Sequence, residues 1–292
     1  MTLPNFLVIG AAKAGTTTMY FYLNQHPQIY MCPRKEPHYF SSDKRYKIST
    51  LSEYESLFQG VSDEILAIGE ASTSYLTHPH AAERIQRHLP NTKLIAILRD
   101  PANRAYSHYL MSMKVRKHKL DSPGYSKQEL NDDFAKIVSS KENVIIQAGF
   151  YYRNLEGYLK LFERNQIQVY WFKDFISHPD TVMRNIFEFL GVDTAFNIDK
   201  SIGNANQGGF IKNQFSEKLI NNLKNNYKKY ISPIIPMMWE YKMKKKYVDV
   251  RKRNRYKPQL PIEIRQQLIE VYREDILKLQ DLLQRDLSIW LQ

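Results

Sequence analysis

The chain has 292 residues, 43% of them hydrophobic, which suits one large α/β domain or two small ones with an ample core. The single cysteine, Cys32, excludes an intrachain disulfide and is interpreted as a small packed side chain. No apolar stretch approaches the ~20 residues of a membrane-spanning helix, and no secretory signal is visible. A cytoplasmic protein without a membrane span is therefore expected.

Apolar runs alternate with helical patterns along the first 190 residues. Strands are predicted at Phe6–Ile9, Ile65–Ile68, Leu94–Leu98 and Val169–Phe172. Helices are predicted at Thr17–Asn24, Ala81–His88, Asn103–Met113, Tyr152–Phe162 and Asp180–Leu190. This alternation predicts an α/β fold with a central parallel sheet covered on both faces. The polar stretch Arg116–Leu130, with Pro123 and Gly124, is predicted to be a surface loop.

The last third of the chain has a different character. Residues 202–210 form a glycine- and amide-rich stretch, and the prolines within 231–239 prevent a helix there. The segment 241–257 holds nine basic residues and one acidic residue, so it contributes +8 of the net charge of +12. Residues 259–291 carry apolar side chains at helical spacing and should pack back as helices. We expect a single domain, with an α/β core over 1–200 and a mostly helical extension over 201–292.

The most informative segment is Asn5–Thr18, NFLVIGAAKAGTTT, where a buried strand runs into a small-residue turn. Gly10 and Gly15 allow a tight turn, and three threonines fall where the next helix begins. Free N–H groups at a helix start bind phosphate. Lys13 precedes Gly15, whereas a P-loop places its Lys after the last Gly and directly before Ser or Thr. The pattern predicts a phosphate cradle of another kind.

A second anion-binding candidate lies within Leu94–Met111. Its predicted strand ends at Arg99, and Asp100 and Pro101 suit the cap and first turn of a helix. Ser107 lies one to two turns into that helix, so it can converge with Arg99 on one anion. Arginine suits this role because its fork binds phosphate oxygens bidentately. The structural alternative is an ion pair between Arg99 and a carboxylate at the strand end.

Together, the two segments resemble the phosphate-binding motifs of sulfotransferases that use 3′-phosphoadenosine 5′-phosphosulfate (PAPS), especially the bacterial and heparan-sulfate-type branch. Segments 35–40 (KEPHYF), 69–75 (GEASTSY), 149–158, 171–175 and 281–291 are also similar to that branch. Either phosphate motif alone has low specificity, but the pair in this order and spacing is specific. The resemblance implies a P-loop-like three-layer α/β/α fold and transfer of a sulfuryl group to a hydroxyl or amine.

The resemblance also implies a donor site without a metal ion. Lys13 would contact the phosphosulfate and stabilise charge on the bridging oxygen as the sulfuryl group leaves. The other implied donor-binding residues are Ala14, Gly15, Thr16, Thr17 and Thr18 for the 5′-phosphate, Arg99 and Ser107 for the 3′-phosphate, and Gly208, Gly209, Phe210 and Lys212 over the adenosine.

The acceptor must lose a proton as it attacks sulfur, and a positioned carboxylate or histidine can accept it. Glu36 matches the base position of the resembled branch, and His38 matches a supporting position. The structural alternatives are an ion pair of Glu36 with Lys35 and a packed or surface role for His38. His26 comes before a proline after a predicted helix and is interpreted as structural.

Two departures from the resembled branch concern the acceptor. Ala71 stands where that branch usually has Lys, and Ser41 stands where it has an acid. The missing lysine makes the acceptor pocket less basic, which suits a neutral or cationic molecule. The sequence therefore favours a small specialised metabolite, for example an alkaloid, as acceptor. A glycan or glycolipid is the alternative.

Two other classes of function are weighed against this one. A P-loop kinase-like NTP-binding protein is disfavoured by the position of Lys13 and by the lack of a convincing strand-end Asp for Mg²⁺. A binding module would use the basic segment 241–257 for nucleic acid, an anionic polymer or peripheral membrane contact. The simpler interpretation of the basic segment is a solvated insertion, so no nucleic-acid partner is expected. The sequence does not determine the oligomeric state.

Overall fold

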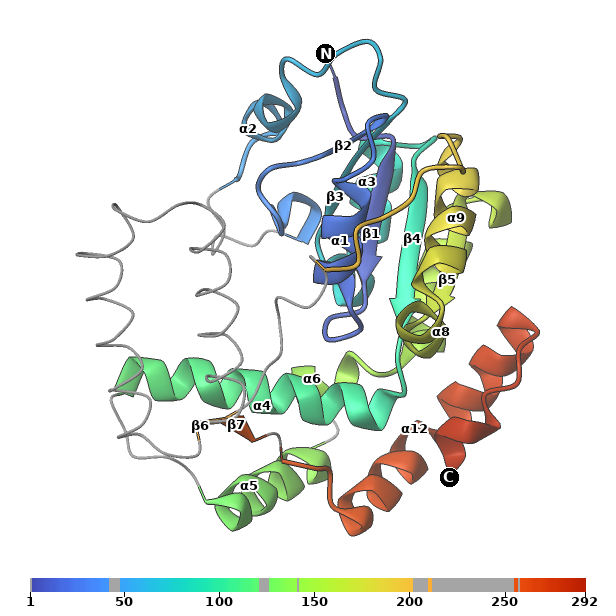
Figure 1. Cartoon of the computed structure of the whole chain (residues 1–292). Coiled ribbons are helices and arrows are strands. Elements are labelled where there is room, and N and C mark those ends of the chain that lie inside the picture. Colours follow the sequence, from blue (N-terminus) through green and yellow to red (C-terminus); the bar gives the residue numbers. More distant parts are fainter. Residues whose placement is uncertain are drawn as a thin grey trace.

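The structure is a computed structural model that describes residues 2–41, 48–120, 126–140, 142–201, 210–211, 255–256 and 258–292. Its centre is a five-stranded sheet in the order β2-β3-β1-β4-β5, and every pairing within it is parallel (Figure 1). The strands are β1 (Phe6–Gly10), β2 (Ile29–Met31), β3 (Ala67–Ala71), β4 (Lys93–Leu98) and β5 (Ile167–Trp171). The predicted parallel sheet is confirmed.

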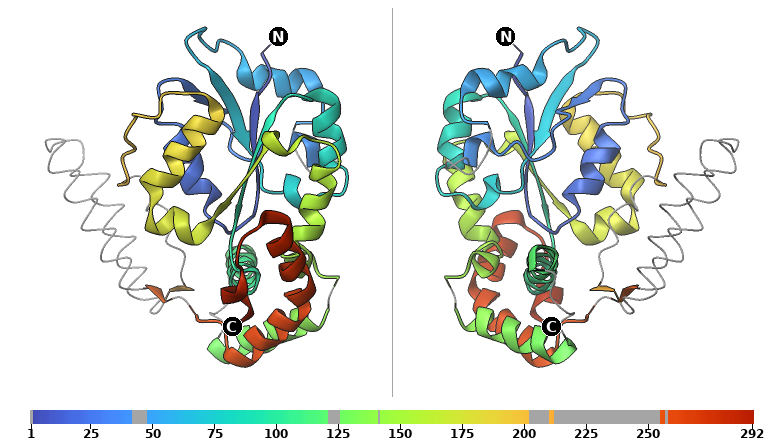
Figure 2. Two further views of the ribbon diagram at one scale, coloured as in Figure 1. Left: turned by 90° about the vertical axis from the view of Figure 1, so that its right-hand side faces the viewer. Right: turned by 90° about the vertical axis from the view of Figure 1, so that its left-hand side faces the viewer.

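Helices cover both faces of this sheet and make three layers (Figure 2). One face carries α1 (Thr16–Leu23), α8 (Phe172–Ser177) and α9 (Pro179–Leu190), and the other carries α3 (Ala81–His88) and α7 (Tyr151–Leu159). All five residues of β1 are buried, because a strand covered on both faces needs apolar side chains on both. The core therefore lies on either side of β1 and β4.

Further helices lie beyond the carboxyl ends of the strands (Figure 1). They are α4 (Pro101–Leu120), α5 (Lys127–Ser139), α6 (Val144–Gln147) and α12 (Ile262–Leu283). The helix α12 packs against α4, α5 and α7, which confirms the helices expected over 259–291. The shorter elements are η1 (Tyr39–Ser41), α2 (Leu51–Glu55), η2 (Ser56–Phe58), η3 (Tyr75–Thr77), η4 (Arg164–Gln166), β6 (Phe210–Ile211), β7 (Arg255–Tyr256) and η7 (Ser288–Leu291).

The prediction of a surface loop over Arg116–Leu130 is wrong at both ends. The helix α4 continues to Leu120, and α5 begins at Lys127. The start of α5 is a capping box: the Ser126 hydroxyl accepts the Glu129 N–H at 3.1 Å, and the Glu129 carboxylate accepts the Ser126 N–H at 2.7 Å. A Ser-x-x-Glu pattern is readable from sequence, and it outweighs the general polarity of the segment.

The third strand lies further along the chain than predicted, and β2 was not predicted. The predicted strand was Ile65–Ile68, whereas β3 spans Ala67–Ala71 and Leu66 is exposed. The apolar pattern stops at Ile68 because Gly69 and Glu70 do not resemble a buried strand. The structure nevertheless buries Glu70 completely.

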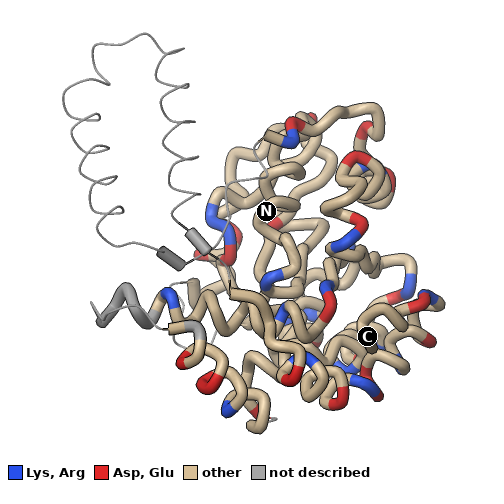
Figure 3. The backbone as a smooth tube through the Cα atoms, turned by 60° about the horizontal axis from the view of Figure 1, so that its bottom comes forward, with Lys and Arg blue, Asp and Glu red and all other residues tan. Residues whose placement is uncertain are grey.

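Several predictions fall outside the described residues. These concern the loop 202–209, the proline-containing segment 231–239 and nearly all of the basic segment 241–257. Within the described part, Lys and Arg positions are interspersed with Asp and Glu positions along the backbone (Figure 3). Among these residues, no helix has the length and apolar character needed to cross a membrane.

Candidate active site

Three loops meet at the carboxyl edge of the sheet because β3, β1 and β4 are neighbours. In open α/β sheets this edge is where ligands bind. The loops after β1 and β3 touch: a Cβ added at Gly10 would lie 2.8 Å from the Leu76 Cβ and 3.4 Å from the Thr73 carbonyl oxygen. Only glycine fits so close an approach, so Gly10 fixes how the two loops meet.

The loop after β1 leads into α1 through two residues with left-handed backbone. Lys13 has a φ of 72° and Gly15 a φ of 94°. A Cβ at Gly15 would also lie 3.2 Å from the Phe172 ring, so both its conformation and its space favour glycine. The helix starts at Thr16, and the N–H groups of its first turn have no partner within the helix. Ala14 and Thr16 are buried, while Thr17 and Thr18 are half-buried.

Arg99 connects the two predicted anion-binding segments. Its Nη1 donates to the Lys13 carbonyl oxygen at 3.2 Å, and its guanidinium lies over the Phe172 ring, 4.9 Å from the centroid. Burial lowers the pKa of Arg99 below its usual value. Among the described residues, Arg99 forms no ion pair with a carboxylate, which was the structural alternative. The neighbouring Asp100 pairs with Arg265 instead.

The Arg99 segment is held by the C-terminal helices. Asp100 accepts the Asn103 N–H at 2.7 Å, as a helix cap does, and its other oxygen lies 2.8 Å from Arg265 Nη2 on α12. Arg265 Nε also donates to the Gln292 carbonyl oxygen at 2.9 Å. The Tyr151 hydroxyl donates to the Arg99 carbonyl oxygen at 2.9 Å. The Asp100 cap was predicted from the sequence, whereas the contacts of Arg265 and Tyr151 were missed because they join segments far apart in the chain.

The helix α4 brings further groups to the same edge. Ser107 lies half-buried in its second turn, and Lys13 Nζ lies 3.4 Å from the Met111 Sδ. The next residue, His108, receives a hydrogen bond from the fully buried Arg104, with Nη1 3.3 Å from Nδ1. Burial, together with the positive charges of Arg104 and Lys13, lowers the pKa of His108 to about 4. The ring is therefore neutral at neutral pH and keeps its proton on Nε2.

Three residues, Lys35, His38 and Thr73, contact the Glu36 carboxylate. Lys35 Nζ lies 2.7 Å from Oε1, and His38 Nε2 lies 3.2 Å from Oε2. The Thr73 hydroxyl donates to Oε2 at 3.1 Å. The Thr73 N–H also lies 3.4 Å from Oε2, so the ion pair with Lys35 is present but is one of several contacts. The Glu36 side chain keeps 29% of its surface exposed, so an acceptor can still reach it.

The His38 ring lies between Glu36 and a pair of serines. Its Nδ1 is 2.6 Å from Ser74 Oγ, which is 2.5 Å from Ser41 Oγ. Burial lowers the pKa of His38, and this effect outweighs the opposing attraction of the Glu36 charge. The network assigns a neutral ring in which Nε2–H donates to Glu36 and Nδ1 accepts from Ser74. Neither serine was predicted to contact His38.

Behind this pair, a fully buried carboxylate lies near the end of β3. Glu70 accepts hydrogen bonds from the hydroxyls of Tyr75 at 2.5 Å, Ser72 at 2.8 Å and Tyr54 at 3.2 Å. Burial raises the pKa of Glu70 to about 7, although these hydroxyl donors oppose the rise. Sequence reasoning did not single out Glu70; the run of hydroxyl residues that follows it is the signal that could have done so.

The raised pKa of Glu70 predicts a pH-dependent stability. A carboxyl whose pKa rises from 4.5 to about 7 on folding contributes stability below pH 4.5 and loses it as pH rises through 7. At 1.36 kcal/mol per pH unit, the loss is about 3 kcal/mol as an upper limit. Glu70→Gln cannot ionise and should lack this slope. Urea unfolding of both proteins between about pH 5 and about pH 8 tests the difference; parallel pH curves would contradict it.

The remaining polar candidates are packed into the fold. The Cys32 thiol is buried, and burial raises its pKa to about 12, which opposes a role as nucleophile. His26 is buried between the rings of Phe187 and Phe196, with Nε2 2.9 Å from the Asp193 carbonyl oxygen. Both side chains therefore have structural surroundings, as interpreted from the sequence.

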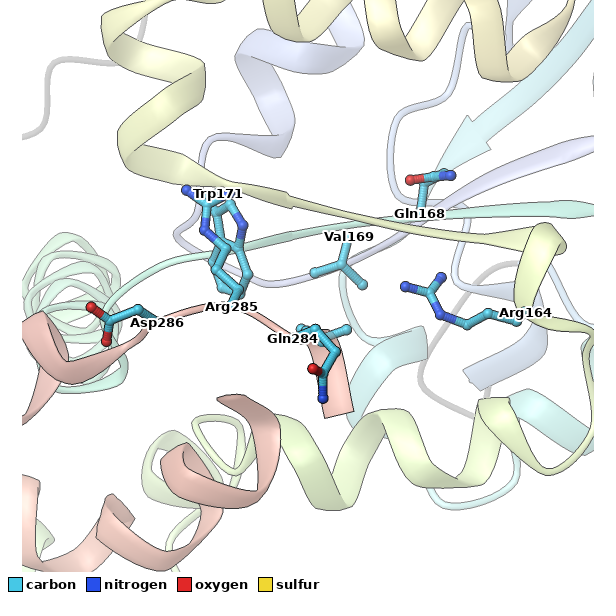
Figure 4. A pocket seen from close by; sticks show the side chains of 8 residues that line it. Arg164, Gln168, Val169, Trp171, Gln284, Arg285 and Asp286 are labelled. Atoms are coloured by element: carbon cyan, nitrogen blue, oxygen red, sulfur yellow. The ribbon is translucent and has the colours of Figure 1, made fainter. Parts of the chain in front are cut away.

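A cavity of about 510 Å³ lies elsewhere, between the edge strand β5 and the residues that follow α12 (Figure 4). None of the predicted site residues within the described ranges lines it. Arg164 donates to the Ile167 carbonyl oxygen, and Arg285 pairs with Asp174 over the Trp171 ring. The two arginines at this cavity are thus engaged in holding the strand edge.

Comparisons with known proteins point to one family. The family model described as "Sulfotransferase domain" matches residues 3–281. The chain is similar to the membrane-associated sulfotransferase kil1 of Dictyostelium discoideum, with 36% identity over 141 residues, 48% of this chain and 30% of that protein. It is also similar to heparan sulfate glucosamine 3-O-sulfotransferase 3A1 of Mus musculus, with 29% identity over 190 residues, 65% of this chain and 46% of that protein. The chain therefore spans less than half the length of these two relatives.

A solved structure matches the fold over its full length. The crystal structure of a sulfotransferase from Alicyclobacillus acidocaldarius covers 100% of both chains, with a TM-score of 0.69 and 27% sequence identity. This likeness confirms the three-layer α/β/α class that the sequence predicts.

Proposed function

The chain belongs to the sulfotransferase family, and we propose that it transfers the sulfuryl group of PAPS to a hydroxyl or amine of an acceptor. The observation that carries the proposal is the contact between the two anion-binding segments. Arg99 donates to the carbonyl oxygen of Lys13, so a strand-end cation lies directly against the loop that opens α1. Two cations and a helix N-terminus then face one edge of the sheet, as a ligand with two separated phosphates requires.

The described residues fit such a donor. The first-turn N–H groups of α1 and the hydroxyls of Thr16, Thr17 and Thr18 would hold the 5′-phosphate. Arg99 and Ser107 would hold the 3′-phosphate. Phe172 packs against both Gly15 and Arg99, which keeps the two phosphate sites in a fixed relation. The proposed contribution of Gly208, Gly209, Phe210 and Lys212 rests on the sequence alone, because the structure describes only the backbone of Phe210 among these four residues.

We propose a direct in-line transfer. The acceptor oxygen or nitrogen forms a bond to sulfur while the bond from sulfur to the bridging oxygen breaks, which leaves adenosine 3′,5′-bisphosphate. Lys13 stabilises the negative charge that develops on the bridging oxygen. Glu36 takes the proton of the acceptor, and its His38 and Thr73 contacts hold the carboxylate in place.

Two acceptor classes each have one supporting observation. Ala71 and Ser41 place no additional charge beside the Glu36–His38 pair, which favours a small uncharged or cationic metabolite. The similarity to heparan sulfate glucosamine 3-O-sulfotransferase 3A1 supports a glycan, because the name of that relative states a glycan acceptor. A transfer assay with PAPS against panels of alkaloids, glycolipids and desulfated glycans separates the two classes.

The donor site should recognise the 3′-phosphate. Calorimetric titration should show tight binding of adenosine 3′,5′-bisphosphate and much weaker binding of adenosine 5′-monophosphate, because Arg99 and Ser107 would lose their ligand. Binding that ignores the 3′-phosphate, or that favours ATP with Mg²⁺, would contradict the proposal and support the kinase-like alternative.

A further inference from the structure

The segment that carries the candidate base has an unfavourable backbone. Glu36 and His38 have φ angles of 62° and 61°, with Pro37 between them. Residues other than glycine seldom adopt this left-handed conformation, because their Cβ approaches the carbonyl oxygen that follows. Such a conformation persists where surrounding contacts hold it. The contacts of the backbone at these residues therefore decide where the Glu36 and His38 side chains point.

Two backbone hydrogen bonds join this segment to β3 and the loop that follows it. The Glu36 N–H donates to the Ala71 carbonyl oxygen at 3.0 Å, and the His38 N–H donates to the Ser72 hydroxyl oxygen at 3.0 Å. The first bond uses only main-chain atoms. The second depends on a side chain, so a substitution can remove it.

The Ser72 hydroxyl is itself fixed by Glu70. It is fully buried and donates to Glu70 Oε2 at 2.8 Å, which leaves its lone pair aimed at the His38 N–H. A second path runs through the Tyr75 hydroxyl, which donates to Glu70 Oε1 and accepts the Phe40 N–H at 3.4 Å. One buried carboxylate thus orients two hydroxyls, and both hydroxyls accept from the backbone next to the candidate base.

We propose that Glu70 and Ser72 are positioning residues, which hold the His38 backbone and thereby aim the Glu36–His38 pair at the acceptor. Both side chains are fully buried, so they act through His38 and not by contact with the acceptor or the donor. The proposal rests on the proposed function of Glu36 and His38. It explains why a carboxylate is kept at a fully buried position of β3, where an apolar residue would bury at lower cost.

The test compares two variants that each remove one hydroxyl donor from Glu70. Ser72→Ala removes the donor that also accepts from the His38 N–H. Tyr54→Phe removes only the hydroxyl that donates to Glu70 Oε1 and keeps the ring that packs on Tyr39 and Phe40. Ser72→Ala should lower kcat about 10- to 100-fold, because small misplacements of a reacting group cost this much. Its KM for PAPS and its affinity for adenosine 3′,5′-bisphosphate should change less than about twofold. Tyr54→Phe should keep kcat within about twofold, although both variants lower the melting temperature.

A second readout does not depend on catalysis. The ¹H–¹³C NMR signals of the His38 ring, assigned with His38→Asn, should shift in Ser72→Ala and Glu70→Gln and stay in place in Tyr54→Phe. If Ser72→Ala lowers kcat no more than Tyr54→Phe does, or leaves the His38 signals unmoved, the positioning role is wrong. If the wild-type chain does not bind the bisphosphate, the proposed function fails, and the NMR signals still decide whether Glu70 and Ser72 position His38.

Discussion

The double variant Lys13→Ala/Arg99→Ala should bind adenosine 3′,5′-bisphosphate about 10²- to 10⁴-fold more weakly than the wild-type chain. Each side chain would supply a charge-assisted contact to a phosphate, and such contacts contribute about 1.5–3 kcal/mol each. The two losses should not simply add, because Arg99 also holds the Lys13 carbonyl oxygen at 3.2 Å. Calorimetric titration of the bisphosphate against the purified variant measures the effect.

The matched control for this variant is Lys160→Ala/Arg273→Ala. It removes the same two positive charges from exposed ion pairs with Glu156 and Glu270. Exposed pairs of this kind contribute little to stability, so the control should fold and should bind the bisphosphate like the wild-type chain. Equal weakening in both variants would mean that the effect is one of overall charge. Undiminished binding in Lys13→Ala/Arg99→Ala would overturn the donor site.

Glu36→Gln should lower the turnover of sulfuryl transfer about 10²- to 10⁴-fold, which is the usual contribution of a positioned general base. Glutamine keeps the size of the side chain and can still accept from Thr73, but it cannot take a proton from the acceptor. The affinity for the bisphosphate should stay within about twofold, because Glu36 contacts the loop after β3 and not the N-terminus of α1. Turnover with saturating PAPS, together with the calorimetric affinity, separates these effects.

Glu64→Gln is the control for this second variant, since Glu64 is an exposed glutamate away from the loops at the carboxyl edge. It should leave both turnover and affinity unchanged. Normal turnover in Glu36→Gln would move the base to His38 or to no side chain, and His38→Asn would decide between these two. Burial lowers the pKa of His38 and so keeps its ring neutral, with a lone pair on Nδ1 that faces Ser74.

The first anion-binding segment shows what a local pattern determines. The apolar run, the two glycines and the threonines of 5–18 predict strand, turn and helix start, and the structure has β1, a left-handed Lys13–Gly15 turn and α1 in that order. The helix Ala81–His88 likewise has the predicted bounds. These features depend on contacts within a few residues of one another, so the order of residue types is enough to predict them.

The surroundings of the candidate base show the opposite case. The pattern of residues 35–40 predicts Glu36 and His38 as candidate site residues. No neighbouring position in the sequence indicates that Ser74 contacts the His38 ring or that Ser72 holds the His38 backbone. These partners lie more than thirty residues away, and the parallel β2–β3 pairing brings the chain after β3 beside the chain after β2. The boundary of β3 was predicted wrongly for a similar reason. Glu70 is polar, and its burial within the strand depends on hydrogen bonds from the hydroxyls of Tyr54, Ser72 and Tyr75.

The sequence by itself thus determined the alternation of strands and helices, the two anion-binding segments and the residue types that suit a sulfuryl donor. Only the tertiary structure decided that Arg99 lies on the Lys13 loop, that Arg265 holds Asp100 from 165 positions away, and that a buried Glu70 lies behind the candidate base. The physical reason is range. Backbone propensity and capping act over a few residues, whereas burial and the choice of hydrogen-bond partner depend on which segments the parallel sheet and its helices bring together.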